Sequence, residues 1–181
     1  MEYTFTLKYQ LSDEDCSHEE LVERLGVAGC TDALVGVGRP GRIGLEFVRE
    51  AHSAEEAMRS ALQDVQTAIP SARLIEASPD LVGITDAADV IGISRQGLRK
   101  LAMEDPTSFP TPVHEGMASV WHLADILVWL HQRRDHQVHA AVIDITAVAR
   151  QVNVAKEAWH LTPGKTSGFE PSFRRELFEP A

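Results

Sequence analysis

Apolar and polar residues alternate with a period of two at the start of the chain, which predicts a half-buried strand. The segment spans residues 3–10, and its apolar side chains would share one face: Tyr3, Phe5, Leu7 and Tyr9. A second alternating segment at residues 42–50 follows a Gly-Arg-Pro-Gly turn. Together with an apolar run at residues 32–37, it predicts a β-hairpin.

Helical spacing of apolar residues separates these predicted strands. Ser17 with Glu20, and Ser53 with Glu56, have the spacing of a capping box at a helix start. With a last strand predicted at residues 72–77, the order becomes β-α-β-β-α-β. This order predicts an α+β fold that begins with a ferredoxin-like domain over residues 1–78, in which two helices cover one face of an antiparallel sheet.

A different pattern begins after a Ser-Pro-Asp hinge at residues 78–80. Thr85 can cap a short helix that ends before Gly92, and Ser94 can cap a second helix over residues 95–103. Two short helices joined by a glycine turn are typical of a helix-turn-helix.

The segment after the second helix predicts a wing, meaning a small hairpin beside the helices. Prolines at positions 106, 110 and 112 exclude helix there, and residues 113–121 form a candidate hairpin that turns at Glu115 and Gly116. A third helix is predicted over residues 123–132 because its apolar residues have helical spacing. We therefore expect a winged helix-turn-helix domain over residues 81–136.

Residues 137–181 predict a C-terminal helix and a loose tail, with the helix centred on residues 147–159. An apolar stripe precedes and enters this helix: Val142, Ile145, Val148 and Val152. Such a stripe either joins the core of its own chain or pairs with its copy in a dimer.

Composition and charge limit where a polyanion could bind. The 181 residues are 44% apolar and 24% charged, which is typical of a folded globular chain, and the net charge is −10. Residues 1–80 hold 7 basic and 15 acidic side chains, whereas residues 81–136 hold 5 and 7. An acidic field repels phosphates, so any phosphate-binding surface is expected in the later part.

The same survey gives expectations about location and cysteine chemistry. No apolar run approaches the roughly 20 residues of a membrane helix, and the first residues lack the pattern of a signal peptide, so we expect a cytoplasmic protein without membrane association. Cys16 and Cys30 are the only cysteines, and we expect both to be free structural thiols.

One stretch resembles a known family. Residues 84–101 read Ile-Thr-Asp-Ala-Ala-Asp-Val-Ile-Gly-Ile-Ser-Arg-Gln-Gly-Leu-Arg-Lys-Leu and are followed by Phe109-Pro110-x-Pro112, by Trp121 and by Val128-Trp129-Leu130. This pattern resembles the excisionase and AlpA-like branch of the MerR-type winged helix-turn-helix proteins. The resemblance implies that the second helix enters the DNA major groove and directs these residues toward DNA: Ser94, Arg95, Gln96, Arg99 and Lys100.

The residue types agree with that implication. Arg95 and Arg99 are one helical turn apart, and Arg can bind guanine with two hydrogen bonds, Gln can bind adenine and Lys can neutralise phosphate. His114 and His122 are the only cationic candidates near the wing, and Arg133 and Arg134 could add contacts to the DNA backbone. So few phosphate contacts predict that one copy binds weakly and that a homodimer occupies two half-sites.

Two other patterns have alternative interpretations. The glycines at positions 36, 38 and 41 match GxGxxG, but they join two strands and include a proline, so a hairpin turn is favoured over a dinucleotide site. Arg39 and Arg42 make the tip of this turn basic, which leaves contact with an acidic partner open. His131, Asp135 and His139 could hold a metal only if one helix continued through all three, and an exposed polar face is favoured.

These patterns predict a sequence-specific regulator that binds double-stranded DNA as a homodimer, and we expect a repressor. The alternative is an antitoxin-like or adaptor protein whose acidic N-terminal domain binds a partner protein. No catalytic motif, cofactor site or metal site is predicted, so we do not expect an enzyme.

Overall fold

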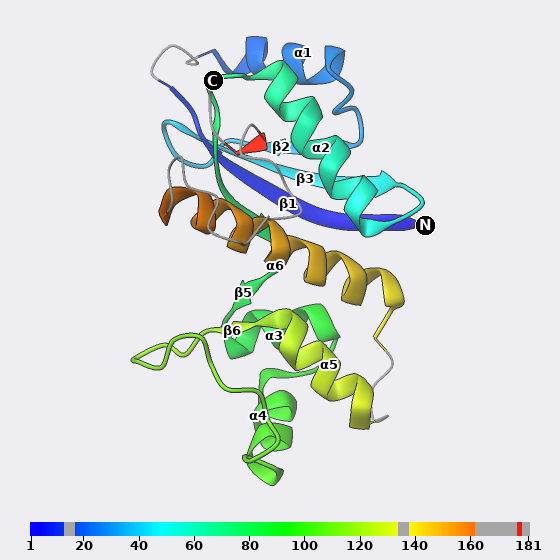
Figure 1. Cartoon of the computed structure of the whole chain (residues 1–181), viewed down its shortest axis with the longest axis vertical. Helices are drawn as coiled ribbons and strands as arrows, with labels where there is room; N and C mark the ends of the chain where they lie inside the picture. Colours follow the sequence, from blue (N-terminus) through cyan, green and yellow to red (C-terminus); the bar gives the residue numbers. More distant parts are fainter. Residues whose placement is uncertain (13–16, 134–137, 162–176, 179–181) are drawn as a thin grey trace.

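The computed structural model describes residues 1–12, 17–133, 138–161 and 177–178, and it has a mixed α+β architecture with antiparallel sheets (Figure 1). None of its helices within these ranges is long and apolar enough to cross a membrane. The elements are, in chain order, β1 (Glu2–Gln10), α1 (His18–Val27), β2 (Ala33–Gly36), β3 (Arg42–Glu50), α2 (Ala54–Ala68), β4 (Arg73–Ser78), β5 (Leu81–Val82), α3 (Ile84–Ile91), α4 (Arg95–Glu104), β6 (Trp121–His122), α5 (Leu123–Arg133) and α6 (Ala140–Leu161).

The larger sheet has the strand order β2-β3-β1-β4, and every neighbouring pair is antiparallel. The predicted alternation is confirmed, because one face of β1 is buried and the other is mostly exposed. Phe5 pairs in register with Phe47, and their rings stack with centroids 5.2 Å apart. The buried face forms the main core with α1 and α2.

The two predicted helix starts are also confirmed. The Ser17 hydroxyl accepts a hydrogen bond from the Glu20 amide at 3.5 Å, and Ser53 accepts one from the Glu56 amide at 3.1 Å. These contacts satisfy amides that the first helical turn leaves without partners. The helices that follow bury their apolar faces on the sheet.

Helix α6 is longer than predicted and begins seven residues earlier, at Ala140. Its stripe at Ile145, Val148 and Val152 is buried in the main core, which answers the question left open by the sequence in favour of packing within this chain. Periodicity missed the first two turns because the helix packs against two cores, and Val142 and Ile143 contact the second one. A single apolar stripe therefore does not describe it.

The second core lies within residues 82–130 and joins α3, α4 and α5 with β5 and β6. Two details differ from the predictions. α3 begins at Ile84 with Gly83 at its N-cap, where the Asp86 carboxylate accepts from the Gly83 amide at 3.3 Å, so Thr85 is not the cap. β6 pairs with β5 rather than extending the wing hairpin.

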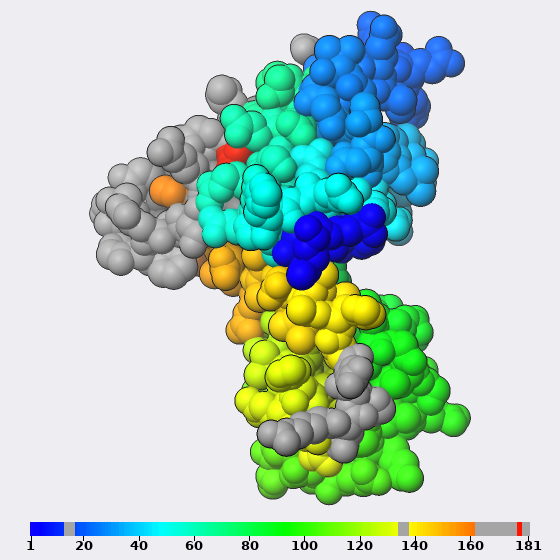
Figure 2. All heavy atoms as spheres, turned by 90° about the vertical axis from the view of Figure 1, so that its right-hand side faces the viewer, coloured from blue at the N-terminus to red at the C-terminus, as the bar shows by residue number. Residues whose placement is uncertain are grey.

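A buried carboxylate joins the two halves of the molecule. Asp80 is 2% exposed, and its Oδ1 lies 2.7 Å from Nδ1 of His122, while Oδ2 accepts from Asn153 at 2.8 Å. The Leu123 amide donates to the Asp80 carbonyl at 2.7 Å. Figure 2 shows the first turns of α6, in yellow, between the blue-to-cyan first half and the green part of the chain.

Candidate nucleic-acid interface

The turn between α3 and α4 is fixed by two local contacts. Gly92 ends α3 in the left-handed region, with φ of 80°, where a side chain would be strained. The Ser94 hydroxyl then accepts from the Gly97 amide at 3.0 Å and begins α4. Both positions were predicted to mark helix ends, and the structure confirms that α3 ends at Ile91 and that α4 begins at Arg95.

Helix α4 is attached to the second core mainly through Leu98, which is fully buried. Its outward side places five predicted residues together, all of them exposed: Ser94, Arg95, Gln96, Arg99 and Lys100. Within the described residues, neither Arg95 nor Arg99 forms a side-chain hydrogen bond or ion pair, while the Lys100 ammonium lies 3.8 Å from Glu104. The two guanidinium groups are therefore available to a ligand.

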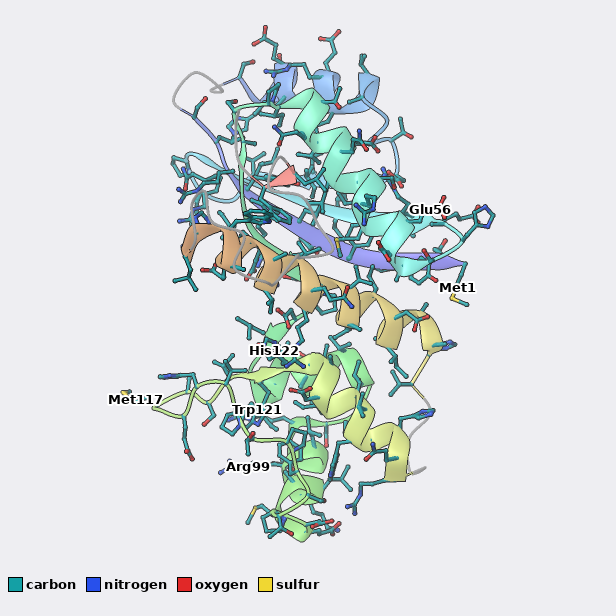
Figure 3. The ribbon with its side chains drawn as sticks, in the orientation of Figure 1. Met1, Glu56, Arg99, Met117, Trp121 and His122 are labelled. Carbon is teal, nitrogen blue, oxygen red and sulfur yellow. The ribbon has the colours of Figure 1, made fainter. Side chains whose placement is uncertain are left out.

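The predicted wing is a loop that projects from the same side as Arg99 in the view of Figure 3, with Met117 at its tip. Its base is closed by hydrogen bonds between residues 113–114 and Val120, including Val120 N to His114 O at 3.0 Å. A Cβ on Gly116 would lie 2.7 Å from Nε2 of His114, so glycine lets the turn pass close to this ring. His114 is exposed but lies on the wing, apart from the α4 residues.

An aromatic cluster holds the base of the wing against α5. The Phe109 ring contacts Trp129 edge-on at 5.0 Å and Trp121 at 6.1 Å. Each indole N–H has a partner, because Trp121 donates to the Pro110 carbonyl and Trp129 to the Ser108 hydroxyl, both at 3.0 Å. The position of the wing relative to α5 is therefore set by packing and by directional bonds.

Arg133 is engaged within the chain. Its guanidinium donates to Asp105 at 3.1 Å and lies 4.7 Å from the centre of the Trp129 ring. Hydrogen bonds from Ser108 and Thr107, together with the charge of Arg133, hold the pKa of Asp105 below its usual value. Asp105 therefore stays ionised and competes with phosphate for Arg133. Arg134 lies outside the described residues.

The described residues of the glycine-rich segment and of the candidate metal pattern do not form ligand sites of the kinds considered in the sequence analysis. β2 and β3 pair around residues 37–41, so the glycine-rich segment is a hairpin turn, as predicted. α5 ends at Arg133 and His139 precedes α6, so the one-helix condition for the metal pattern is not met, and Asp135 lies outside the described residues. In those residues no group of three side chains could hold a metal ion.

The sequence missed the contacts that position the interface. The Asp105–Arg133 pair and the Asp80–His122 pair join residues 28 and 42 positions apart. The two partners of each pair lie in separate segments of the chain, so no local motif marks them. No known protein family, curated protein or solved structure matches this chain.

Proposed function

We propose that this chain is a sequence-specific regulator that binds double-stranded DNA as a homodimer and represses by occupying a promoter. The observation that carries the proposal is the exposed side of α4, where Arg95 and Arg99 extend without partners in the described residues. An exposed helix of this kind fits the major groove, which is about 12 Å wide.

Two assignments of fold belong to the proposal. Residues 81–136 are a winged helix-turn-helix of the excisionase and AlpA-like type, supported by the helix, glycine turn and capped helix and by the loop at residues 113–120. Residues 1–78 are a ferredoxin-like module for dimerisation or partner binding, supported by the β-α-β-β-α-β order and the strand order β2-β3-β1-β4.

The mechanism follows from the side chains on α4. Arg95 and Arg99 read guanine edges, Gln96 reads adenine, and Lys100 with the Ser94 end of the helix neutralises phosphate. The wing adds only His114, and Asp105 holds Arg133, so one copy makes few phosphate contacts. Two copies on half-sites about 34–36 Å apart supply the affinity that one lacks.

Selection of bound fragments from random DNA, with the full chain at two salt concentrations, tests this function. We expect a two-fold symmetric site. Arg95→Ala with Arg99→Ala should weaken binding to that site at least about tenfold, because each guanine contact is worth about 1–3 kcal/mol. Lys100→Ala should weaken binding to all sequences and lower the salt dependence.

The matched control is Arg39→Ala with Arg42→Ala, which removes the same two charges from an exposed turn outside α4. This control should bind the selected site as the wild type does. The proposal is contradicted if the selection enriches no DNA sequence, or if the two double variants lose the same affinity for the selected site.

The second candidate function is an antitoxin-like or adaptor module that binds a partner protein. The acidic excess of residues 1–80 favours it. Leu34 and Val48 favour it as well, because they are 72% and 45% exposed on the open face of the larger sheet, meaning the face opposite α1 and α2. Copurification of a stoichiometric basic partner, with no enrichment of DNA, would support this candidate instead.

A further inference from the structure

We propose that the open face of the larger sheet holds a binding site for a small phosphate-bearing anion, in a hollow between the β2–β3 turn and β1. The hollow has a volume of about 620 Å³. The residues that carry the inference are Lys8, Gly36, Arg39, Arg42, Gly44 and Ile75. The site is separate from α4 and does not depend on DNA binding.

Two glycines form the floor of this hollow. Gly36 of β2 and Gly44 of β3 are register partners, and Lys8 of β1 is the next residue across the sheet. Neither glycine has a positive φ, and a Cβ on Gly44 would make an ordinary contact, 3.8 Å from the Gly36 carbonyl oxygen. Neither backbone conformation nor packing therefore requires glycine at these positions. Glycine inside a strand weakens it and often marks the close approach of a ligand.

Positive charge gathers at the same place. Arg39, Arg42 and Lys8 are three of the 7 basic residues among the first 80, and all three line the hollow, which also includes one acidic residue, Glu76. Neither arginine side chain has a hydrogen-bond or ion-pair partner in the described residues, whereas Lys8 contacts Glu76 at 2.5 Å. In a region with 15 acidic residues, this is a local reversal of charge.

The arrangement indicates the chemistry of the ligand. Guanidinium groups bind phosphate through paired hydrogen bonds, so Arg39 and Arg42 provide an anion-binding edge. The bare glycine floor beside Ile75 can accept a flat, less polar group. A nucleoside diphosphate has both features and fits better than phosphate alone.

Calorimetric titration of the full chain with adenosine diphosphate, and separately with sodium pyrophosphate, tests the site. We expect both probes to bind, with adenosine diphosphate the tighter. Arg39→Ala with Arg42→Ala should raise the Kd of both at least about tenfold, because charged hydrogen bonds are lost. Gly44→Val should raise the Kd of adenosine diphosphate by a similar factor and change that of pyrophosphate much less.

Arg24→Ala with Arg59→Ala, on helices α1 and α2 outside the hollow, is the charge-matched control and should bind both probes as the wild type does. Gly44→Ala gives the same test with less bulk if the valine variant does not fold. The proposal is overturned if the wild type binds neither probe, or if the control loses as much affinity as the Arg39 and Arg42 variant. It is also overturned if the substitutions at Gly44 leave the Kd of adenosine diphosphate unchanged.

Discussion

Arg49 is a buried arginine that joins several segments of the main core through polar contacts. It is 8% exposed, and its guanidinium donates to Asp32 at 2.7 Å, to Asp64 at 2.8 Å and to the Ser60 hydroxyl at 2.9 Å. Burial favours the neutral form, but the hydrogen bonds to both carboxylates outweigh it, so the pKa of Arg49 is raised. The side chain thereby connects β3 to α2 and to the loop before β2.

Arg49→Ala should lower the free energy of unfolding by about 3 kcal/mol, because it leaves two carboxylates facing each other without their cation. Urea unfolding followed by circular dichroism measures this change. Arg59→Ala is the control, since Arg59 forms an exposed pair with Glu55 on α2 and should cost well under about 1 kcal/mol. Equal costs for the two variants would contradict the role of Arg49.

Cys30 provides a pH-dependent test at the same scale. Burial raises the pKa of its thiol from 9.0 to about 11, and the nearby Asp64 adds to the increase. Because the folded state favours the neutral thiol, its contribution to stability is complete below pH 9 and is lost as pH rises toward 11. The difference in unfolding free energy between wild type and Cys30→Ala should therefore change across this range, in favour of the variant at high pH.

At the scale of elements, α6 closes the outer edge of the sheet. The Asn153 amide group donates to the Ala77 carbonyl at 2.8 Å and accepts from the Ala77 amide at 2.9 Å. Lys156 donates to the Ile75 carbonyl, and the Leu74 amide donates to the Phe178 carbonyl at 2.9 Å. The side chains of Asn153 and Lys156 and the Phe178 carbonyl thus take the place of a neighbouring strand along β4. They protect a sheet edge that could otherwise pair with another chain.

Asn153→Ala should destabilise the protein by about 2 kcal/mol, because it leaves buried backbone groups of Ala77 without partners. Hydrogen exchange should show that the Ala77 amide loses protection more than amides in the centre of β1 do. Gln151→Ala, at an exposed position of the same helix, should change neither quantity. Unchanged protection at Ala77 in the Asn153 variant would show that the strand edge does not depend on this side chain.

At the scale of the whole molecule, the two hydrophobic cores are coupled through α6 and through Asp80. Val142 and Ile143 of α6 pack on the second core, while Ile145 and Val148 belong to the first. Asp80 links His122 to Asn153 at the same junction, and Figure 3 shows His122 on the side of the second core that is nearest α6. Because the contacts are shared, we expect the two cores to unfold together.

Asp80→Ala should reduce that cooperativity. In a Trp159→Phe background, urea midpoints from far-ultraviolet circular dichroism and from tryptophan fluorescence should coincide. The two remaining tryptophans, Trp121 and Trp129, belong to the second core, whereas circular dichroism reports on the helices and strands of both cores. In the variant the two midpoints should separate. Glu157→Ala, an exposed change on α6, should leave them together.

The local elements could be predicted from the sequence because their causes lie within a few residues. Alternation in β1, the caps at Ser53 and Ser94 and the break at Gly92 depend on backbone geometry and on neighbouring side chains. The exposed arginines of α4 were predicted for the same reason. The predicted N-cap of α3, Thr85, was wrong by two residues. Thr85 and Asp86 both offer oxygens that can accept from a backbone amide at the helix start, and the path of the chain from β5 brings the Gly83 amide to Asp86.

The sequence by itself therefore determined the order of the elements, the buried face of the sheet and the cationic side of α4, since each depends on periodicity or on a capping residue. The tertiary structure alone decided that α6 belongs to the chain's own cores, that Arg133 is held by Asp105, and that Gly36, Gly44 and the free arginines of the β2–β3 turn lie around one hollow. These outcomes depend on residues brought together from separate segments, and the energy of such contacts leaves no local pattern in the chain.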